Sequence, residues 1–457
     1  MNTDSSAQDA GRPRGLLRTV GIVAIPVGIA AVVVALVAAL LDSEGYLPGG
    51  AMVRSWEAPR DLNAADHGNG GWLVDDTVVR TRFDAVTGFG AADGKERWEY
   101  VVPGRAEICA VGTTTADGIG LIAYGEDGDV EKGGGCATAA AIDLRTGDEL
   151  WHTPVAADTD VLEEQPDLVA VGGGLAVLRD SDADWAYEPH PHDDPEDRLA
   201  GTEALRAVDA RTGAARWKAA MPKGCVPYRV SATEKQVLAV LACELKDLEL
   251  AAFDPADGAL RWAAPLDARR SVAVDAEVSV LSADPPVVQV AESADRGVHA
   301  FLAFSADGRP QGRIEFDGAY GEIPADRSRA KVAVSDGRLV AVAAYPYKGF
   351  TYDQLVAFDL KSGDEAWRAK PRKRDFSGLY VGGGRVTAIS DPNEKDTSDD
   401  KLDVYDLETG DEKDDRSFRE DVDNDSRELA DVYAYKDLLI LARWGDAVHP
   451  LTAYKKW

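Results

Sequence analysis

Residues 141–151 read AIDLRTGDELW, and this stretch decides the fold. It predicts a strand, a tight turn and a second strand. The carboxylate of Asp143 can accept hydrogen bonds from the turn backbone, and Gly147 supplies the positive φ that a short hairpin needs. Trp151 has a side chain large enough to fill the space between two packed layers. The stretch is important because the chain repeats it.

The repeated pattern is an apolar residue, Asp, two variable residues, then Thr, Ser or Asp, a glycine, three more residues and Trp. The repeat glycines are Gly94, Gly147, Gly213, Gly258, Gly308, Gly363 and Gly410, and the repeat tryptophans are Trp98, Trp151, Trp217, Trp262 and Trp367. The copies at Gly308 and Gly410 lack the tryptophan. Successive glycines lie 45 to 66 residues apart. A spacing of about 50 residues is typical of one four-stranded blade of a β-propeller.

Alternation of apolar and polar residues fills the chain between these copies. Residues 236–245 and 248–253 form one pair of alternating runs, and residues 338–345 and 354–358 form another. Period-two alternation with turn residues between the runs is typical of antiparallel strands. No segment after residue 45 has a convincing helical period. The sequence therefore predicts an all-β domain.

The two ends of the repeat region complement each other. Residues 430–435, 438–443 and 449–454 resemble the first three strands of a further blade, and residues 53–59 resemble a fourth strand without a blade of its own. Joining them closes a ring and leaves no exposed edge strand. Seven internal blades and this one predict an eight-bladed β-propeller of four-stranded antiparallel blades. Seven blades is the alternative, if one of the degraded copies is not a blade.

Length and charge restrict the class of protein. A chain of 457 residues would by default form two or three domains, but the repeat predicts a single ring of about 400 residues. The 50 basic and 80 acidic residues give a net charge of −30. This charge disfavours nucleic acid and anionic lipid as partners. It favours solubility, and it would also attract a basic partner or cations.

The N-terminal segment predicts a membrane anchor. Residues 1–18 are polar and carry three arginines, and residues 19–41 contain no charge over 23 positions. About 20 apolar residues span a bilayer, and the positive-inside rule places the arginine-rich end in the cytoplasm. We therefore expect a cytoplasmic tail (1–18), a transmembrane helix (19–41), a linker (42–51) and an extracytoplasmic propeller (52–457).

This topology makes the protein a single-pass protein of the cell membrane. A cleavable signal peptide is the alternative, because Val37-Ala38-Ala39 provides small residues suited to a cleavage site. Cleavable apolar regions are usually about 7–15 residues long, which is shorter than the run found here.

The four cysteines allow three disulfide pairings. Cys109 and Cys136 fall within one predicted blade, and Cys225 and Cys243 fall within another. Pairing within each blade is the most economical geometry, and an oxidising compartment would permit it. Four separate buried thiols are the alternative.

The longest interval between repeat glycines, 66 residues, results from an insertion at residues 181–201. This insertion contains two aromatic residues and two histidines, namely Trp185, Tyr187, His190 and His192. The histidine spacing matches no zinc pattern and no cysteine lies nearby. As an insertion on a rigid scaffold, the segment is the best candidate for contact with a protein or ligand.

Other candidate sites have simpler interpretations. The repeated tryptophans are best interpreted as packing between blades, and the repeated aspartates as turn caps. Residues 421–425 (DVDND) resemble the start of a calcium loop but lack its glycine at position six and its glutamate at position twelve. The sequence contains no Gly-x-Ser-x-Gly, His-Glu-x-x-His or Walker motif. No catalytic residue, cofactor or metal is therefore expected.

The pattern Ala-x-Asp-x-x-Thr-Gly-x-x-x-Trp resembles the tryptophan-docking repeat of the pyrroloquinoline-quinone (PQQ) dehydrogenase family. The best copies are residues 141–151, 207–217, 252–262 and 357–367, and the resemblance covers most of residues 52–457. It implies an eight-bladed propeller.

The activity of that family does not transfer with the repeat. These quinoproteins stack their cofactor on a disulfide between adjacent cysteines, whereas Cys225 and Cys243 are 18 residues apart. The catalytic Asp and the calcium ligands of the family match no position in this chain. We therefore expect neither PQQ nor calcium.

The same repeat builds non-enzymatic scaffolds, such as the propeller lipoprotein of the outer-membrane assembly machine, and sensor ectodomains of bacterial membrane kinases. We therefore expect a membrane-anchored extracytoplasmic scaffold that binds an unidentified protein or small ligand without catalysis. The alternative is an enzyme with a site in the central channel, either a PQQ- and calcium-dependent quinoprotein dehydrogenase or a hydrolase. A third hypothesis is sensing of cations or of a polycationic partner by the acidic loops.

Overall fold

The computed structural model describes residues 32–38, 41, 49–60, 68–126, 135–155, 168–181, 202–244, 246–294, 296–325, 329–347, 349–370, 374–392, 400–419, 429–444 and 449–456. Residues 32–38 are helical. Within these ranges, no helix combines the length and the apolar character that a membrane crossing requires. The expected transmembrane helix, residues 19–41, lies largely outside them.

Five sheets share one design, in which four strands follow each other in order along the chain. The first two are β2 (Gly68–Val74), β3 (Thr77–Arg82), β4 (Ala85–Gly90) and β5 (Glu96–Val101), then β6 (Glu107–Val111), β7 (Ile119–Glu126), β8 (Gly135–Asp143) and β9 (Glu149–Pro154). The third and fourth are β10 (Val169–Gly172), β11 (Leu175–Ser181), β12 (Thr202–Asp209) and β13 (Ala215–Ala220), then β14 (Cys225–Ala232), β15 (Val237–Cys243), β16 (Asp247–Phe253) and β17 (Leu260–Pro265). The fifth is β18 (Glu277–Ala283), β19 (Pro286–Ala291), β20 (His299–Phe304) and β21 (Pro310–Glu315).

Two sheets depart from this design. One contains β24 (Val332–Ser335), β25 (Arg338–Tyr347), β26 (Phe350–Asp359) and β27 (Glu365–Arg368), with the small hairpin of β22 (Asp317–Gly318) and β23 (Gly321–Glu322) beside β25. The other has eight strands, namely β28 (Arg374–Gly382), β29 (Arg385–Pro392), β30 (Lys401–Asp406), β31 (Glu412–Phe418), β1 (Ala51–Glu57), β34 (Leu451–Lys456), β33 (Leu438–Ala442) and β32 (Asp431–Tyr435). Strand β1 pairs antiparallel with β34 and, over two residues, parallel with β31. The N-terminal strand therefore completes the C-terminal sheet.

Burial explains why these segments are strands. Strand β15 is buried along its whole length, because sheets cover both of its faces. Strand β17, at the outer edge of the same sheet, alternates between exposed and half-buried residues. Runs of Val, Leu and Ala suit the covered central strands, and alternation suits the outer strands.

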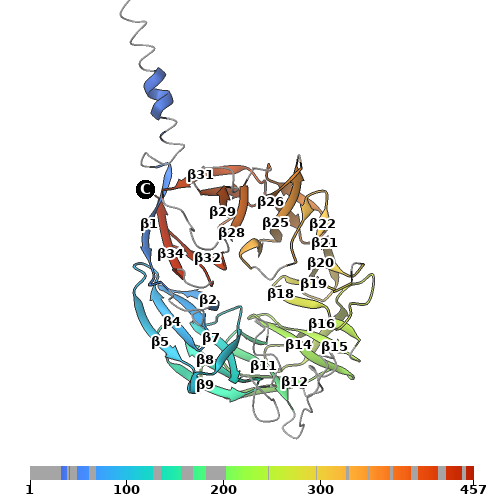
Figure 1. Ribbon diagram of the computed structural model, residues 1–457. Helices are drawn as coiled ribbons and strands as arrows, with labels where there is room; N and C mark the ends of the chain where they lie inside the picture. Colours follow the sequence, from blue (N-terminus) through green and yellow to red (C-terminus); the bar gives the residue numbers. More distant parts are fainter. Residues whose placement is uncertain are drawn as a thin grey trace, which may run out of the picture.

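The apolar cores lie between consecutive groups of four strands. Eight clusters of buried apolar side chains occur among the described residues. One joins Leu238 of β15 to Val288 of β19. Another joins Ile440 of β33 to Val78 of β3, so that the C-terminal strands contact the first sheet. These contacts close the ring of sheets seen in Figure 1, where the N-terminal (blue) and C-terminal (red) strands lie side by side.

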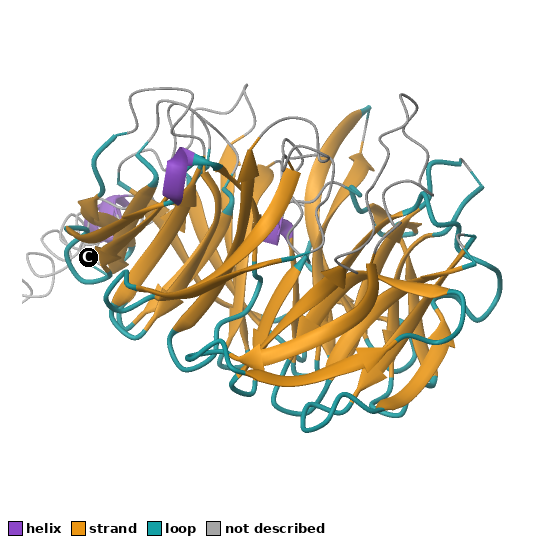
Figure 2. Cartoon of the chain, turned by 90° about the horizontal axis from the view of Figure 1, so that it is seen from below, coloured by secondary structure: helices purple, strands orange, loops and turns teal. Residues whose placement is uncertain are grey.

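The ring has two different faces. One end of the ring carries the turns between the first and second strands and between the third and fourth strands of each sheet, such as residues 75–76 and 144–148. We call this end the turn face. The loop face is the opposite end, where the second strand connects to the third and one sheet connects to the next. Figure 2 shows the strands (orange) running between these two faces.

Candidate binding surfaces

On the turn face, each repeat aspartate caps the turn that follows it. Asp209 Oδ1 accepts hydrogen bonds from the backbone N–H groups of Arg211 (3.2 Å) and Thr212 (3.0 Å) and from the Thr212 hydroxyl (2.9 Å). The Arg216 guanidinium, together with these bonds, lowers the pKa of Asp209 to about 2. The same backbone cap is formed by Asp143, Asp254, Asp359 and Asp406. A carboxylate held in this way is a poor general base at neutral pH.

The repeat tryptophans join each sheet to the next. The Trp151 indole N–H donates to the carbonyl of Ala210 in the following sheet at 2.9 Å. Gly213 lies against the ring, and a Cβ at this glycine would be only 2.9 Å from Trp151 Cγ. The same contact is made by Trp56 with Gly94, Trp98 with Gly147, Trp217 with Gly258, Trp262 with Gly308 and Trp367 with Gly410. Each of these glycines therefore receives the tryptophan of the preceding sheet.

The two copies without tryptophan use other contacts. Gly312 occupies the tryptophan position after Gly308, and its N–H donates to the Leu360 carbonyl at 2.9 Å. The two backbones are in direct contact here, so that an indole has no room. Asp414 occupies the tryptophan position after Gly410. Its carboxylate accepts hydrogen bonds from Arg416 Nε (2.9 Å) and Lys456 Nζ (3.1 Å).

We predict that Gly312→Ala lowers the free energy of unfolding by about 1–3 kcal/mol, the usual cost of overpacking a close contact. A Cβ at this position would lie 2.6 Å from Gly363 N and from Leu360 O, and backbone atoms cannot move aside cheaply. Urea unfolding measures the loss. The exposed neighbour Gln311 gives the control, since Gln311→Ala should change the stability by less than about 0.5 kcal/mol. Equal stability of the two variants would contradict the contact.

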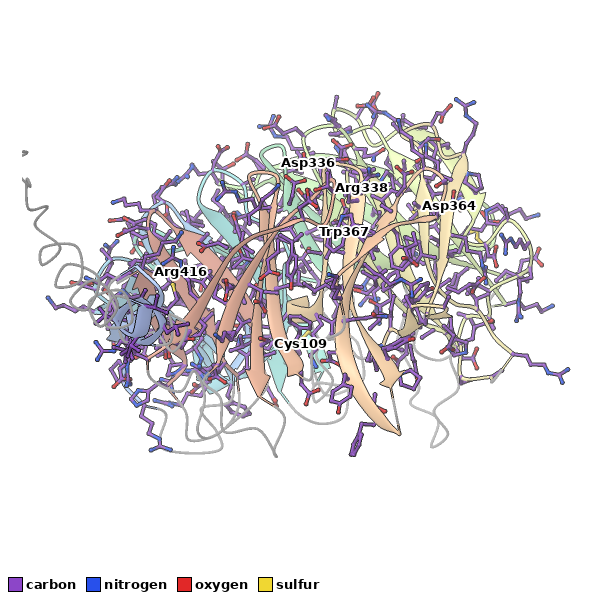
Figure 3. The ribbon with its side chains drawn as sticks, turned by 90° about the horizontal axis from the view of Figure 1, so that it is seen from above. Cys109, Asp336, Arg338, Asp364, Trp367 and Arg416 are labelled. Atoms are coloured by element: carbon purple, nitrogen blue, oxygen red, sulfur yellow. A yellow bond between two sulfur atoms is a disulfide. The ribbon has the colours of Figure 1, made fainter. Side chains whose placement is uncertain are left out.

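Arginines form a second set of links between sheets on the turn face. Arg145 Nε lies 2.6 Å from an Asp75 oxygen of the preceding sheet. Arg338 contacts Asp359 of its own sheet and Glu408 of the next sheet, the latter at 2.8 Å. Figure 3 shows Arg338 on this side of the molecule. Exposed ion pairs of this kind contribute little energy each, but they engage the charged groups of the turn face in contacts within the ring.

The structure confirms the pairing of cysteines within sheets. Cys225 and Cys243 are directly opposed on β14 and β15 with a Cα–Cα distance of 3.9 Å. The Cys109–Cys136 disulfide links β6 to β8 across β7, with a Cα–Cα distance of 6.0 Å. The β6 ladder shifts register at Cys109, and the β8 ladder shifts register beside Cys136. These irregularities let the two side chains meet across the intervening strand.

The described residues offer few groups suited to holding a metal or a cofactor. Among the described residues, one group of three candidate metal ligands lies within 4.8 Å, namely Cys225, Cys243 and Glu249. Its two sulfurs are bonded to each other and cannot bind a metal as thiolates. The two disulfides join residues 27 and 18 positions apart, not the adjacent cysteines on which quinoproteins stack PQQ. The two disulfides therefore do not provide that particular stacking platform, and the absence of PQQ stays a prediction.

The predicted contact residues Trp185, Tyr187, His190 and His192 lie outside the described residues, and so do residues 421–425. Contact through the 181–201 segment stays a prediction. The described surface has two other groups of polar side chains, one in a hollow beside β1 and one on the strands β5 and β9.

A hollow of 470 Å³ lies where the end of β1 meets the turn at Gly94. Carboxylates of Glu57, Asp93 and Glu96 line it, together with His449. The His449 ring nitrogen Nδ1 lies 2.8 Å from the Ala58 carbonyl, and Nε2 lies 3.8 Å from Glu57 Oε1. These contacts fix the imidazole to the junction between the N- and C-terminal segments.

A second group of polar side chains lies on the outer strands β5 and β9. The Tyr100 hydroxyl donates to Glu149, and His152 Nδ1 lies 2.5 Å from the other Glu149 oxygen. Burial alone would raise the pKa of Glu149, but the bonds from His152 and Tyr100 lower it. Burial and the same carboxylate raise the pKa of Tyr100 far above its usual range. The group links two sheets, as the turn-face arginines do.

Sequence reasoning missed one feature of the loop face, the extended β25–β26 hairpin. Its register runs without interruption from Arg338 opposite Asp359 to Tyr347 opposite Phe350. The expected strands ended at residue 345 and began again at residue 354. The sequence signal for the longer hairpin was the occurrence of aromatic residues at every second position on both sides of Lys348-Gly349.

Asp353 lies on this hairpin and accepts a hydrogen bond from the Phe376 N–H of the next sheet at 2.9 Å. Burial raises the pKa of Asp353 to about 6, and the nearby Asp375 adds to the effect, whereas the Phe376 bond and Lys331 oppose it. A raised carboxyl pKa means that the folded state favours the neutral form. At pH values below its ordinary pKa, Asp353 therefore stabilises the fold. This contribution is lost as the pH rises through 6.

We predict that Asp353→Asn raises the free energy of unfolding on the order of 2 kcal/mol at about pH 8, relative to the parent, with no gain at about pH 3.5. The amide keeps an acceptor for the Phe376 N–H and has no charge to desolvate. Urea unfolding of both proteins across this pH range measures the difference. The exposed Asp336→Asn variant, measured under the same conditions, is the control. A constant difference between Asp353→Asn and the parent would contradict the raised pKa.

The ring of four-stranded antiparallel units and the tryptophan–glycine contacts define the class of this protein, a β-propeller built from tryptophan-docking repeats. Residues 54–186, 196–311 and 298–413 match the family model described as outer membrane protein assembly factor BamB. The chain therefore belongs to this family of PQQ-like propeller repeats. No curated protein matches it in sequence.

Solved structures of similar shape have low sequence identity. BamB from Moraxella catarrhalis is 14% identical over 87% of this chain and 99% of its own, with a TM-score of 0.48. The computationally designed Ika8 protein is 11% identical over 88% and 99%, with a TM-score of 0.51. The quinohemoprotein alcohol dehydrogenase ADHIIG from Pseudomonas putida HK5 is 12% identical over 90% and 77%, with a TM-score of 0.49. The likeness to Ika8 concerns the fold alone, and family membership leaves both a binding and a catalytic role open.

Proposed function

We propose that this protein is a non-catalytic scaffold that binds a partner, either a protein or a small ligand, through the loop face or central channel of an eight-bladed propeller. In this proposal the propeller lies on the extracytoplasmic side of the cell membrane and is held there by residues 19–41. Neither PQQ nor calcium takes part in the function.

The observation that carries this proposal is the use of the repeat residues. The repeat aspartates cap turns, and the repeat tryptophans and turn-face arginines join neighbouring sheets. These groups are held by contacts within the ring and are poorly placed to act on a substrate. The β25–β26 hairpin belongs to the loop face, where a partner could reach it, and the ends of β11 and β12 between which the 181–201 insertion connects are on the same face.

Eight blades are supported by two observations. The described residues form eight apolar clusters between groups of four strands, and β1 pairs with β34 to complete the last group. The eight-stranded sheet would then be two blades joined by the short parallel contact of β1 with β31.

The anchored topology is supported by the uncharged run of 19–41 and by the two disulfides, which form in oxidising compartments. We expect the full-length chain to stay with membranes after an alkaline carbonate wash. Protease added outside intact cells should digest the propeller and spare an N-terminal tag. Release of the chain by carbonate would contradict the anchor.

The scaffold role is tested by cross-linking the full-length chain in its native membranes with a lysine-reactive reagent. We expect one or a few protein partners at constant stoichiometry after purification. In parallel, purified full-length chain is mixed with PQQ and calcium and examined for a bound chromophore and for dye reduction. Dye reduction by a chain that cross-links to no partner would overturn the proposal in favour of a quinoprotein.

A further inference from the structure

The β25–β26 hairpin extends beyond the strands that flank it. Strand β23 pairs with β25 at one position, Glu322 opposite Ala344, and the pairing of β26 with β27 begins at Val356. The last three cross-strand pairs, residues 345–347 with 350–352, lie past both of these pairings. At about 3.3 Å per residue, this is a two-stranded ribbon about 10 Å long. In Figure 3 its end lies on the side of the molecule opposite Arg338.

Aromatic residues occupy one face of this ribbon. Directly opposed residues share a face, and so do residues two apart on one strand. Tyr345 lies opposite Tyr352, and Phe350 lies two positions before Tyr352 on the same strand. The Phe350 and Tyr352 rings are 6.2 Å apart between centroids. Exposure increases outward, from 8% at Tyr352 to 54% at Phe350, the latter among the largest values for an apolar side chain in the ring.

The base of the hairpin is held firmly. Gln354 is buried, and its Nε2 donates to the Tyr320 carbonyl of the neighbouring small hairpin. The Tyr320 ring packs edge-on against Phe358 of β26, with centroids 4.9 Å apart. Asp353 accepts the Phe376 N–H from the next sheet. An exposed aromatic side chain on a rigid support loses little entropy when it binds, which is the property of an anchor residue at an interface.

Charged groups of both signs lie at this base, and Arg368 of β27 donates to the Ala319 carbonyl of the small hairpin. Asp317 and Glu322 are exposed on the small hairpin beside β25, and Asp353 lies on β26 itself. The whole chain has a net charge of −30. The excess of acidic groups over the whole chain favours a partner with basic side chains around the contact and disfavours nucleic acid or an anionic lipid surface.

We propose that the aromatic end of the β25–β26 hairpin inserts into an apolar pocket, bordered by lysine or arginine side chains, on a folded protein partner. The inference rests on the proposed scaffold function and names its contact element. Phe350 is the anchor that fills the pocket, and Tyr345 and Tyr352 support it from the base of the ribbon. Glu322 and Asp317 pair with the basic rim and give the association its salt dependence.

The test begins with the photo-crosslinking residue p-benzoylphenylalanine at position 350 of the full-length chain in its native membranes. The same residue at Leu260 is the matched control, because Leu260 is 46% exposed on β17, away from the hairpin. We expect one protein to be cross-linked from position 350 and not from position 260. Peptide mapping should place the cross-link in an apolar pocket with lysine or arginine around it. A cross-link to lipid or to a second copy of this chain would overturn the proposal.

Affinity measurements with that purified partner and full-length variants complete the test. Phe350→Ser should weaken binding about tenfold or more, as loss of an anchor residue does. Leu260→Ser should leave it unchanged, and Glu322→Gln should reduce its salt dependence. Equal thermal unfolding midpoints of the variants show that each is folded. If Phe350→Ser binds as well as the parent, the hairpin assignment is wrong and the scaffold stands. If neither photo-crosslinking nor lysine cross-linking yields a protein partner, both proposals fall.

Discussion

Replacement of Trp367 by alanine is expected to lower the free energy of unfolding by about 3–5 kcal/mol, the cost of removing a buried aromatic side chain. Trp367 is 8% exposed and stacks on Tyr405 of the next sheet, with ring centroids 6.3 Å apart. Its indole N–H donates to the Leu407 carbonyl at 2.7 Å. A single side chain thus provides both apolar contact and a hydrogen bond between two sheets. Urea unfolding followed by circular dichroism measures the loss.

The hydrogen bond can be separated from the apolar contact by phenylalanine substitutions. Trp367→Phe keeps most of the apolar area but leaves the Leu407 carbonyl without its donor, which should cost about 1–3 kcal/mol. Trp98 is the matched control, since its indole nitrogen is buried without a hydrogen-bond partner among the described residues. Trp98→Phe loses no such bond and should be the milder change. A larger loss for Trp98→Phe than for Trp367→Phe would contradict this account.

Removal of the Cys109–Cys136 disulfide by double alanine substitution should cost about 3–4 kcal/mol, according to the loop-entropy relation for a loop of this length. The bond closes a sequence separation of 27 residues, longer than the 18 of Cys225–Cys243. It also ties the innermost strand β6 to β8 across β7, so that three strands of one sheet are joined. Unfolding in non-reducing urea measures the effect.

The second disulfide provides the comparison for this measurement. The Cys225–Cys243 double alanine variant should lose somewhat less stability, because its loop is shorter and the two strands are already paired directly. Dithiothreitol should bring the parent close to the stability of the variant without either disulfide. A loss below about 1 kcal/mol for the Cys109–Cys136 variant would contradict a stabilising role for that bond.

Local patterns carried most of the fold prediction. Alternating runs and turn residues predicted the strands around Val237 and Leu250, and the structure has β15 and β16 there. The cysteine pairing was also accessible, because the strands of one antiparallel unit bring cysteines that are close in sequence near each other, either on adjacent strands or across one strand. The β25–β26 extension was not predicted, although its alternating aromatic residues are visible in the sequence.

The candidate surfaces were less predictable than the strands. The 181–201 insertion was chosen for its length and composition, and it lies largely outside the described residues. The hairpin that carries Phe350 has no insertion in its repeat interval. Its distinction is that, among the described residues, no flanking strand pairs with its last three positions, which depends on how far β23 and β27 extend beside it.

The sequence by itself determined the repeating unit of strand, turn and strand in residues 141–151. Period-two alternation, the Asp143 cap and the positive φ of Gly147 act within a few residues, so they can be identified without knowledge of the rest of the chain. Only the tertiary structure decided which partners these units take. Trp151 meets Ala210, 59 residues away, because sheet-to-sheet packing brings each tryptophan onto the turn of the following copy. The same packing explains Gly312. In the sequence it replaces the repeat tryptophan, and in the fold its backbone is in direct contact with the backbone of the following sheet.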